Sequence, residues 1–330
     1  MKKFKLGLWV LAIFCVLVFS ISPSIAANKP NVVVMMVDNL GWGELGVYGG
    51  GELRGAPTPR LDKLAEEGMR LQNFNVEPQC TPTRSAFMTG RRPIRSGTTK
   101  VVWGMLYGLT SWEVTMAEML SEVGYATGMF GKWHLGRTPG RFPTDQGFDE
   151  WWGISESSDE ASYSAHRLYP NEWPVPKIHE ARRGEPQRGV AAFDLATRPL
   201  MDEGITERTV EFIGRNAAEG RPFFVYASFT NLHPPMIPHP DFDDGRGAYA
   251  ANVAELDVRT GQILDDHVLA AQVEAALVEE FPQTKVSARS GDVFVAVYGA
   301  LAWLSRYGDL WTEPQLAMLL PEWTAHSQVT

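Results

Sequence analysis

The sequence has very little cysteine. Only Cys15 and Cys80 occur in 330 residues, and Cys15 lies in an N-terminal apolar run that we expect to be removed. Exported proteins usually pair their cysteines or lack them, and a single cysteine cannot form an intramolecular disulfide. Cys80 is therefore either a buried apolar residue of the core or a chemically active group. The residues around it in the sequence distinguish between these two interpretations.

A long hydrophobic run occurs at the N-terminus. Three lysines stand within the first five residues, an apolar run follows over residues 6–21, and residues 24–26 end it with Ser-Ile-Ala. This pattern predicts a secretory signal peptide over residues 1–26. An uncleaved membrane anchor is the alternative, but the run is rather short for a spanning helix. We expect an exported protein, periplasmic or extracellular.

Positive charge is scarce. The chain has 30 Lys and Arg against 39 Asp and Glu, which gives a formal net charge of −9. Loss of the three lysines with the signal peptide would bring it to −12. No basic stripe offsets this acidity, so the composition argues against a nucleic-acid partner. No internal repeat is evident either.

Apolar runs alternate with amphipathic patterns along the chain. Residues 31–38, 69–76, 125–131 and 221–229 are predicted strands. Residues 58–68, 111–124 and 202–218 are predicted helices, the first with Thr58 as N-cap and Pro59 at the first helical position. This alternation predicts an α/β fold with a mostly parallel central sheet flanked by helices. Residues 139–199 have weak periodicity, and we expect long loops over one end of the sheet there.

Polar side chains follow three of these strands. Asp38 and Asn39 end the first, Lys132 and His134 follow the strand at 125–131, and His233 follows the strand at 221–229. Each of them alone would pass for an ordinary loop residue. In open α/β sheets, however, ligands bind beyond the carboxyl ends of the strands. The sequence therefore predicts one shared site at this edge.

Cys80 belongs to a predicted helix start. Thr81 resembles an N-cap and Pro82 a first helical residue, so Cys80 would lie at the helix N-terminus, where free N–H groups favour anions and lower a thiol pKa. Arg84 would share a helical face with Cys80 if the helix begins early. Its planar fork suits an oxyanion, and His134 could serve a cysteine nucleophile as base.

The residues around Cys80 resemble a known signature. Residues 80–84, Cys-Thr-Pro-Thr-Arg, and 88–91, Met-Thr-Gly-Arg, resemble the sulfatase motif Cys-x-Pro-x-Arg followed by Leu or Met-Thr-Gly-Arg or Lys. Further similar patterns occur in the family's order, including "GYATGMFGKWHLG", "PTDQGFDEWWG", "NLHPP" and a helix over residues 247–264. The resemblance covers roughly residues 28–265 and implies an alkaline-phosphatase-like fold.

The resemblance also implies cofactors. In this family the motif cysteine, here Cys80, is oxidised to formylglycine by a separate generating or anaerobic maturing enzyme. A divalent cation, usually calcium, polarises the sulfate. By position, Asp38 and Asn39 would be calcium ligands, and converted Cys80 would also touch the metal. Asn39 stands where many members have Asp, so the site has one negative charge fewer; its carbonyl oxygen still suits a hard cation.

The same resemblance assigns the remaining roles. Arg84 would hold the formylglycine and Lys132 would contact sulfate. His134 would be the base that breaks down the sulfo-enzyme, and His233 would contact sulfate or assist the leaving oxygen. Histidine suits such roles because its pKa is near neutral. The implied function is hydrolysis of aryl or carbohydrate sulfate esters by an arylsulfatase-like enzyme.

The resemblance stops near residue 266. A strand ending in an Asp-Asn-Gly-like pair and a later sulfate-binding lysine belong to the family but are not recognisable here. The sequence therefore predicts residues 28–266 as the N-terminal part of a sulfatase catalytic domain whose sheet is left with an exposed edge. Residues 265–267, Asp-Asp-His, are a weak substitute for the missing ligands. Residues 267–330 form an unassigned helix–hairpin tail, weakly similar to a BON-type module or the product of a fusion or frameshift.

Two other functions stay open. The chain is an inactive sulfatase-like protein or sulfated-glycan binder if the missing ligands are not replaced. It is a phosphoester or phosphonate hydrolase if the shared superfamily chemistry serves another ester. Trp133, Trp151 and Trp152 would stack on a substrate ring or simply pack in the core.

Overall fold

The computed structural model describes residues 29–41, 43–72, 74–102, 107–265 and 293–297. Residues from Asn31 onward form one compact unit. Within the described part, no helix is long and apolar enough to cross a membrane. The predicted signal peptide over residues 1–26 lies outside the described residues and stays a prediction.

The described strands form one sheet in the order β5-β4-β3-β2-β6-β1-β7. Five of its strands run parallel, and β4 and β5 are antiparallel to their neighbours. This arrangement confirms the predicted α/β fold with a mostly parallel sheet. The strands are β1 (Val32–Met36), β2 (Ala126–Lys132), β3 (Glu150–Ile154), β4 (Lys177–Arg182), β5 (Arg188–Ala192), β6 (Phe223–Ser228) and β7 (Val293–Val297).

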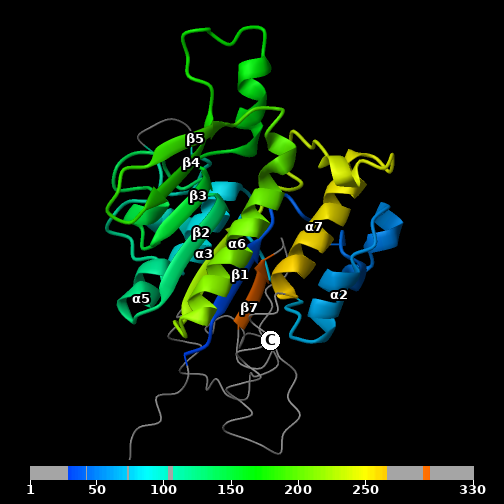
Figure 1. Ribbon diagram of the computed structural model, residues 1–330, viewed down its shortest axis with the longest axis horizontal. Coiled ribbons are helices and arrows are strands. Elements are labelled where there is room, and N and C mark those ends of the chain that lie inside the picture. Colours follow the sequence, from blue (N-terminus) through cyan, green and yellow to red (C-terminus); the bar gives the residue numbers. More distant parts are fainter. Residues whose placement is uncertain (1–28, 42, 73, 103–106, 266–292, 298–330) are drawn as a thin grey trace, which may run out of the picture. The chain divides into compact units, whose positions relative to one another are not determined.

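Helices cover both faces of this sheet (Figure 1). The α-helices are α2 (Pro59–Glu66), α3 (Cys80–Thr89), α4 (Pro93–Ser96), α5 (Met116–Glu122), α6 (Met201–Ala218) and α7 (Ala248–Leu264). Short 3-10 helices are η1 (Gly46–Tyr48), η2 (Gly51–Arg54), η3 (Pro143–Asp145), η4 (Ser158–Ala165), η5 (Arg198–Leu200) and η6 (Pro240–Phe242). Thr115 begins α5 with a capping box that it shares with Glu118.

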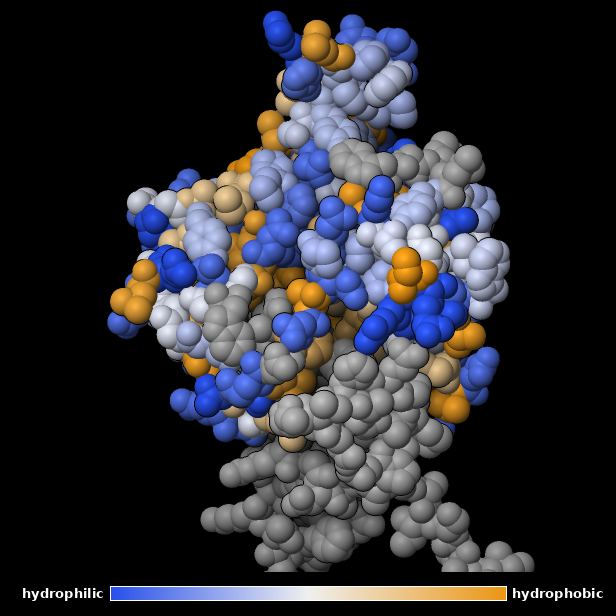
Figure 2. All heavy atoms as spheres, turned by 180° about the vertical axis from the view of Figure 1, so that it is seen from behind, coloured by the Kyte–Doolittle hydropathy of each residue, from blue (hydrophilic) through white to orange (hydrophobic). Residues whose placement is uncertain are grey.

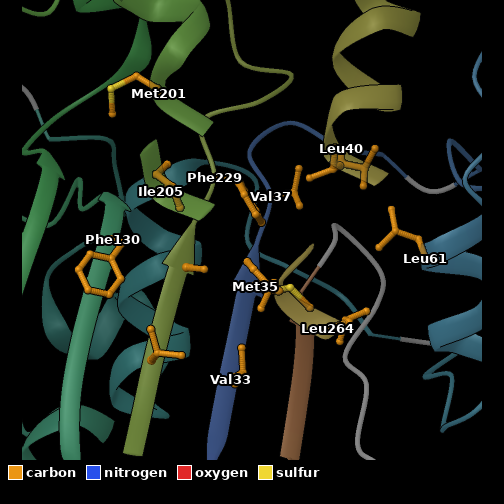
Figure 3. Close-up of a cluster of buried hydrophobic side chains, with 14 of the residues drawn as sticks. Val33, Met35, Val37, Leu40, Leu61, Phe130, Met201, Ile205, Phe229 and Leu264 are labelled. Atoms are coloured by element: carbon orange, nitrogen blue, oxygen red, sulfur yellow. The ribbon is translucent and has the colours of Figure 1, made fainter. Parts of the chain in front are cut away.

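Strand β1 shows how the layers are built. All five of its residues are buried, and successive side chains point to opposite faces. Val33 and Met35 join the core cluster beneath α2, α6 and α7 (Figure 3). Val32, Val34 and Met36 join the second cluster, which packs against α3 and α5. An apolar run without alternation is therefore the signature of this central strand.

One glycine fixes the end of β2. Gly131 has φ +115°, and a Cβ there would lie 1.9 Å from the backbone oxygen of Ser228 on β6. Only a residue without a side chain allows β2 and β6 to approach this closely. The close approach places the next residue, Lys132, at the carboxyl edge of the sheet.

Most predicted elements are present, but residues 69–76 are not a strand. The described residues there form turns and irregular backbone. Met69 and Val76 are 48% and 38% exposed, so this apolar segment is not drawn into the sheet. Local propensity without burial does not make a strand.

Residues 139–199 also differ from the prediction of long loops. They contain β3, which pairs parallel with β2, and the β4–β5 extension of the sheet. The periodicity is weak because β3 is short and buries Trp151 and Trp152 on opposite faces, in the two different core clusters. Strand β5 is the exposed sheet edge, with little apolar pattern. Irregular segments still separate these strands.

Strand β7 pairs with β1 in parallel over five residues, so β7 is the last described strand at that end of the sheet. The predicted hairpin would pair β7 with the residues just before it, and it stays a prediction. Apart from residues 293–297, the predicted helix–hairpin tail lies outside the described part of the chain. Seen from behind, the described surface is largely hydrophilic with scattered hydrophobic side chains (Figure 2).

Candidate active site

The structure brings the predicted strand-end residues together at the carboxyl edge of the sheet. Asp38 lies two residues beyond β1, Lys132 is the last residue of β2, and His233 lies five residues beyond β6. Cys80 is the first residue of α3. One ligand atom from each of Asp38, Cys80 and His233 lies within 4.8 Å of the other two.

Asp38 is the centre of the charge arrangement. It is 5% exposed, and its Oδ2 lies 2.5 Å from Lys132 Nζ and 3.5 Å from Arg84 Nη2. Burial alone would raise the pKa of Asp38, but these two cations and His233 hold it well below its usual range. Asp38 is therefore ionised at any physiological pH.

Cys80 sits between Asp38 and Lys132. Its thiol donates to Asp38 Oδ1 at 3.4 Å, and Lys132 Nζ lies 3.5 Å from its sulfur. Burial raises the pKa of the thiol, and Asp38 adds to the rise, although Lys132 and Arg84 oppose it. The predicted lowering of this pKa by the helix N-terminus is wrong, because desolvation and a neighbouring carboxylate outweigh it. As a thiol, Cys80 is a poor nucleophile at neutral pH.

Helix α3 begins earlier than the sequence predicts. Its N-cap is Gln79 and Cys80 is the first helical residue, so Thr81 is not the cap and Pro82 is the third helical residue. The Thr81 hydroxyl instead donates to the His134 carbonyl at 2.8 Å and accepts from the Val102 N–H at 3.0 Å.

The early start puts Cys80 and Arg84 one helical turn apart, as predicted, on one face. Arg84 is 2% exposed. Its Nη1 donates to the Lys132 carbonyl at 2.7 Å and to the Ser228 hydroxyl. These bonds fix the guanidinium beside Asp38, while its buried Nε has no hydrogen-bond partner among the described residues.

His134 is held rigidly at the edge. It has φ +56° and is 3% exposed, and its N–H donates to the Ser155 carbonyl at 3.1 Å. Burial lowers its pKa well below the ordinary value, and Lys132 and Arg84 lower it further. Its ring is therefore neutral, and its buried Nδ1 has no partner in the described part of the chain.

His233 is oriented by its own loop. Its Nδ1 lies 2.8 Å from the Pro234 carbonyl, and its Nε2 lies 3.4 Å from the Ser157 hydroxyl. Burial lowers its pKa, and Lys132 adds to the effect. Because a carbonyl can only accept, the neutral ring carries its proton on Nδ1. The lone pair on Nε2 is then available to a substrate.

Sequence reasoning missed the residues that hold this loop. Arg198 begins η5 and Asp202 lies one turn later, in the first turn of α6; both are almost completely buried. Arg198 donates to the carbonyls of Thr230 and His233 at 2.8 and 3.0 Å. Asp202 accepts from the N–H and hydroxyl of Thr230 at 2.6 and 2.7 Å. The only sequence signal was an i,i+4 pair, which usually marks a solvated helix face.

A second missed group includes two carboxyls after β3, on either side of Ser157, whose hydroxyl lies 3.4 Å from His233 Nε2. Arg137 forms an ion pair with Glu156 at 2.9 Å and lies 3.8 Å from Glu160. Burial and the neighbouring Glu156 raise the pKa of Glu160 to about 8. Since residues 139–199 were expected to be loops, nothing in the sequence placed these carboxyls near the site.

The structure places the three predicted tryptophans in the core and Asn39 at the surface. Trp133, Trp151 and Trp152 are at most 8% exposed, so they pack in the core rather than stack on a ligand. Asn39 is exposed, with φ +63°. Asp265, offered as a substitute ligand, is the C-cap residue of α7; its two successors lie outside the described residues.

The described residues do not fit a calcium ion. Calcium takes roughly six to eight oxygen ligands, whereas only the Asp38 carboxylate, the Asn39 amide and a formylglycine at position 80 are predicted to offer oxygens among the described residues. Two permanent cations, Lys132 and Arg84, already lie at that carboxylate. A site with more fixed positive than negative charge opposes a divalent cation.

The residues do fit a formylglycine at position 80. The side chain of Cys80 is partly exposed, at the first turn of a ten-residue helix. Where its sulfur now lies, Lys132 can donate to an oxygen and Asp38 can accept from a hydroxyl.

Comparison with known proteins identifies the family. The Sulfatase family model matches residues 30–269. Arylsulfatase G of Rattus norvegicus is 34% identical over 269 residues, which cover 76% of this chain and 51% of that protein. N-acetylgalactosamine-6-sulfatase of Canis lupus familiaris is 34% identical over 255 residues, which cover 72% and 47%.

The solved structures point the same way. PsFucS1 sulfatase from Pseudoalteromonas sp. has a TM-score of 0.66 and 30% identity, and the match covers 81% of this chain and 54% of that one. The chain thus spans about half the length of the curated relatives that it matches. A family match over most of the chain, together with relatives of this identity, shows that the chain belongs to the sulfatase family.

Proposed function

We propose that this chain hydrolyses sulfate monoesters of aryl or carbohydrate compounds. The observation that carries the proposal is the position of Cys80, at the first turn of α3 with Lys132 Nζ and Asp38 Oδ1 within 3.5 Å of its sulfur. The proposed reaction uses a nucleophile precursor, here Cys80, with the Lys132 ammonium and the Asp38 carboxylate beside it. Membership of the sulfatase family supports the reaction class.

Cys80 acts after conversion to formylglycine by a maturing enzyme, which is the partner that this proposal requires. The hydrated aldehyde supplies two geminal hydroxyls, one for attack on sulfur and one for release of sulfate. The raised pKa of the Cys80 thiol supports this reading. A cysteine used as a thiolate nucleophile would need the opposite shift.

The chain's own residues bind and orient the ester. The Lys132 ammonium and the N-terminal N–H groups of α3 face the sulfate oxygens, where they offset developing negative charge. Arg84 keeps Asp38 in place, because its guanidinium is fixed by the Lys132 carbonyl and the Ser228 hydroxyl. A fixed Asp38 in turn holds the ammonium of Lys132 toward position 80.

Two histidines handle protons. Neutral His134 presents its unpartnered Nδ1 as the base. His233 keeps its Nδ1 proton on the Pro234 carbonyl and turns Nε2 toward the substrate oxygen. Burial lowers the pKa of each ring, so each starts the reaction without a second proton and with a lone pair free to accept one from the reacting group.

Calcium is the family's expected cation, with Asp38 and Asn39 as the proposed ligands. Because the described residues do not fit this ion, no step above depends on it. Export to the periplasm or exterior is likewise the proposed location.

Turnover of an aryl sulfate tests the proposal. The chain is co-expressed with a maturing enzyme, and release of phenol from aryl sulfate and aryl phosphate is measured side by side. Cys80→Ala is the inactive control, and Cys80→Ser tests the need for two hydroxyls. We expect turnover of sulfate by the wild-type chain alone. Equal rates for wild type and Cys80→Ala would overturn the proposal, and a preference for phosphate would reassign the substrate to phosphoesters.

A further inference from the structure

We propose that the site binds a sulfate-type oxyanion without a divalent cation, because the Lys132 ammonium occupies the position that would bridge Asp38 and residue 80. This inference rests on the proposed function for its site. It departs from the family's metal requirement, and it concerns binding by this chain's own residues.

The Lys132 ammonium lies between Asp38 and residue 80. Asp38 and Cys80 are the predicted metal ligands, and Lys132 Nζ lies 2.5 Å from Asp38 Oδ2 and 3.5 Å from Cys80 Sγ. Lys132 is completely buried, and it is the last residue of β2, whose backbone is fixed by pairing with β3 and β6. A cation that joined Asp38 and residue 80 would have to displace this ammonium.

The charge of the site also bears on the ligand. Lys132 and Arg84 both contact Asp38 Oδ2, so these three fixed groups sum to one positive charge. A sulfate monoester would neutralise the cluster and inorganic sulfate would bring it to one negative charge, whereas a divalent cation would bring it to three positive charges.

Hydrogen bonding bears on the ligand as well. His134 Nδ1 and Arg84 Nε are buried polar atoms without partners in the described residues, and both side chains are more than nine-tenths buried. Such atoms are rare unless a ligand or water completes them. Arg84 Nε can donate to an oxyanion, whereas His134 Nδ1, as an acceptor, needs a donor such as water.

Binding of inorganic sulfate tests the inference. The full chain is freed of metal by dialysis against a chelator and returned to chelator-free buffer at low ionic strength, where charge effects are not screened. Sulfate is then titrated by calorimetry with and without added calcium. We expect saturable one-to-one binding that calcium leaves unchanged. Sulfate binding that appears only with calcium would overturn the inference.

Two variants sharpen the result. Lys132→Gln removes the bridging cation and should weaken sulfate binding about tenfold or more. Lys177→Gln, an exposed lysine on β4, is the matched control and should change nothing. If circular dichroism shows that Lys132→Gln does not fold, the sulfate affinity of the wild type, measured with and without calcium, still tests the inference.

Asp38→Asn distinguishes sulfate binding without a metal from sulfate binding through a metal, because the two predict opposite changes in sulfate affinity. Removal of this carboxylate leaves Lys132 and Arg84 unneutralised, so sulfate should bind at least as tightly as to the wild type. A site that needs a metal would lose binding with its carboxylate ligand, and that result would refute the inference.

These outcomes are distinct from those of the proposed function. Sulfate binding without calcium but no ester turnover would uphold this inference and refute the proposed hydrolysis. Ester turnover together with sulfate binding that appears only with calcium would do the reverse.

Discussion

Replacement of Arg198 by methionine tests how the His233 loop is held. Arg198 and Asp202 are 0% and 1% exposed, and the guanidinium donates to Thr230 and to the His233 carbonyl. Arg198→Met removes these bonds and leaves a buried carboxylate without its cation. Breaking a buried pair in this way costs about 3–5 kcal/mol, a large part of the roughly 5–15 kcal/mol that stabilises a typical domain.

The magnitude can be checked with a matched control and a double variant. Arg215 is on α6, the helix that carries Asp202, but it is 38% exposed, in an ion pair with Glu150, so Arg215→Met should cost about 1 kcal/mol or less. The double variant Arg198→Met with Asp202→Asn removes both buried charges and should be more stable than Arg198→Met alone by about 1 kcal/mol or more.

Urea unfolding followed by tryptophan fluorescence and circular dichroism measures these differences, provided that the two probes give coincident transitions. Two results would refute the reasoning. One is a free energy of unfolding for Arg198→Met within about 1 kcal/mol of the wild type. The other is a double variant less stable than Arg198→Met, because removal of an unpaired buried charge has to help.

Three further changes have distinct expected outcomes. The raised Glu160 pKa of about 8 means that its stabilising contribution is complete at acidic pH and is lost as pH rises through about 8. The melting temperature of Glu160→Gln should therefore fall less than that of the wild type between pH 6 and 9, and parallel curves would contradict this. Gly131→Ala should lower the free energy of unfolding and the activity together, because its Cβ meets the Ser228 backbone at 1.9 Å; unchanged crystal geometry with full activity would count against it. Thr115→Ala should cost about 1 kcal/mol of unfolding free energy by loss of the α5 cap, and a cost near zero would show that the cap is not needed.

The central sheet was predictable because burial leaves a direct trace in the sequence. The run at β1 lacks alternation, since both of its faces are covered by helices. The strand-end rule placed Asp38, Lys132 and His233 at one edge, and the structure brings them together there. Their chemical roles remain proposals.

Other features leave no local trace. Strand β3 is five residues long with two buried tryptophans, and its pairing partner lies elsewhere in the chain. The thiol pKa at Cys80 depends on desolvation and on Asp38, a contact between residues 42 positions apart. The helix-terminus argument used only neighbours in sequence, so it gave the opposite sign.

Mass spectrometry of the tryptic peptide over residues 71–84 tests the central claim most directly. The peptide carries Cys80, and the chain is purified after co-expression with a maturing enzyme. The account predicts an aldehyde at position 80, together with sulfate release from an aryl sulfate. An unmodified thiol throughout, with no sulfate release, would contradict it.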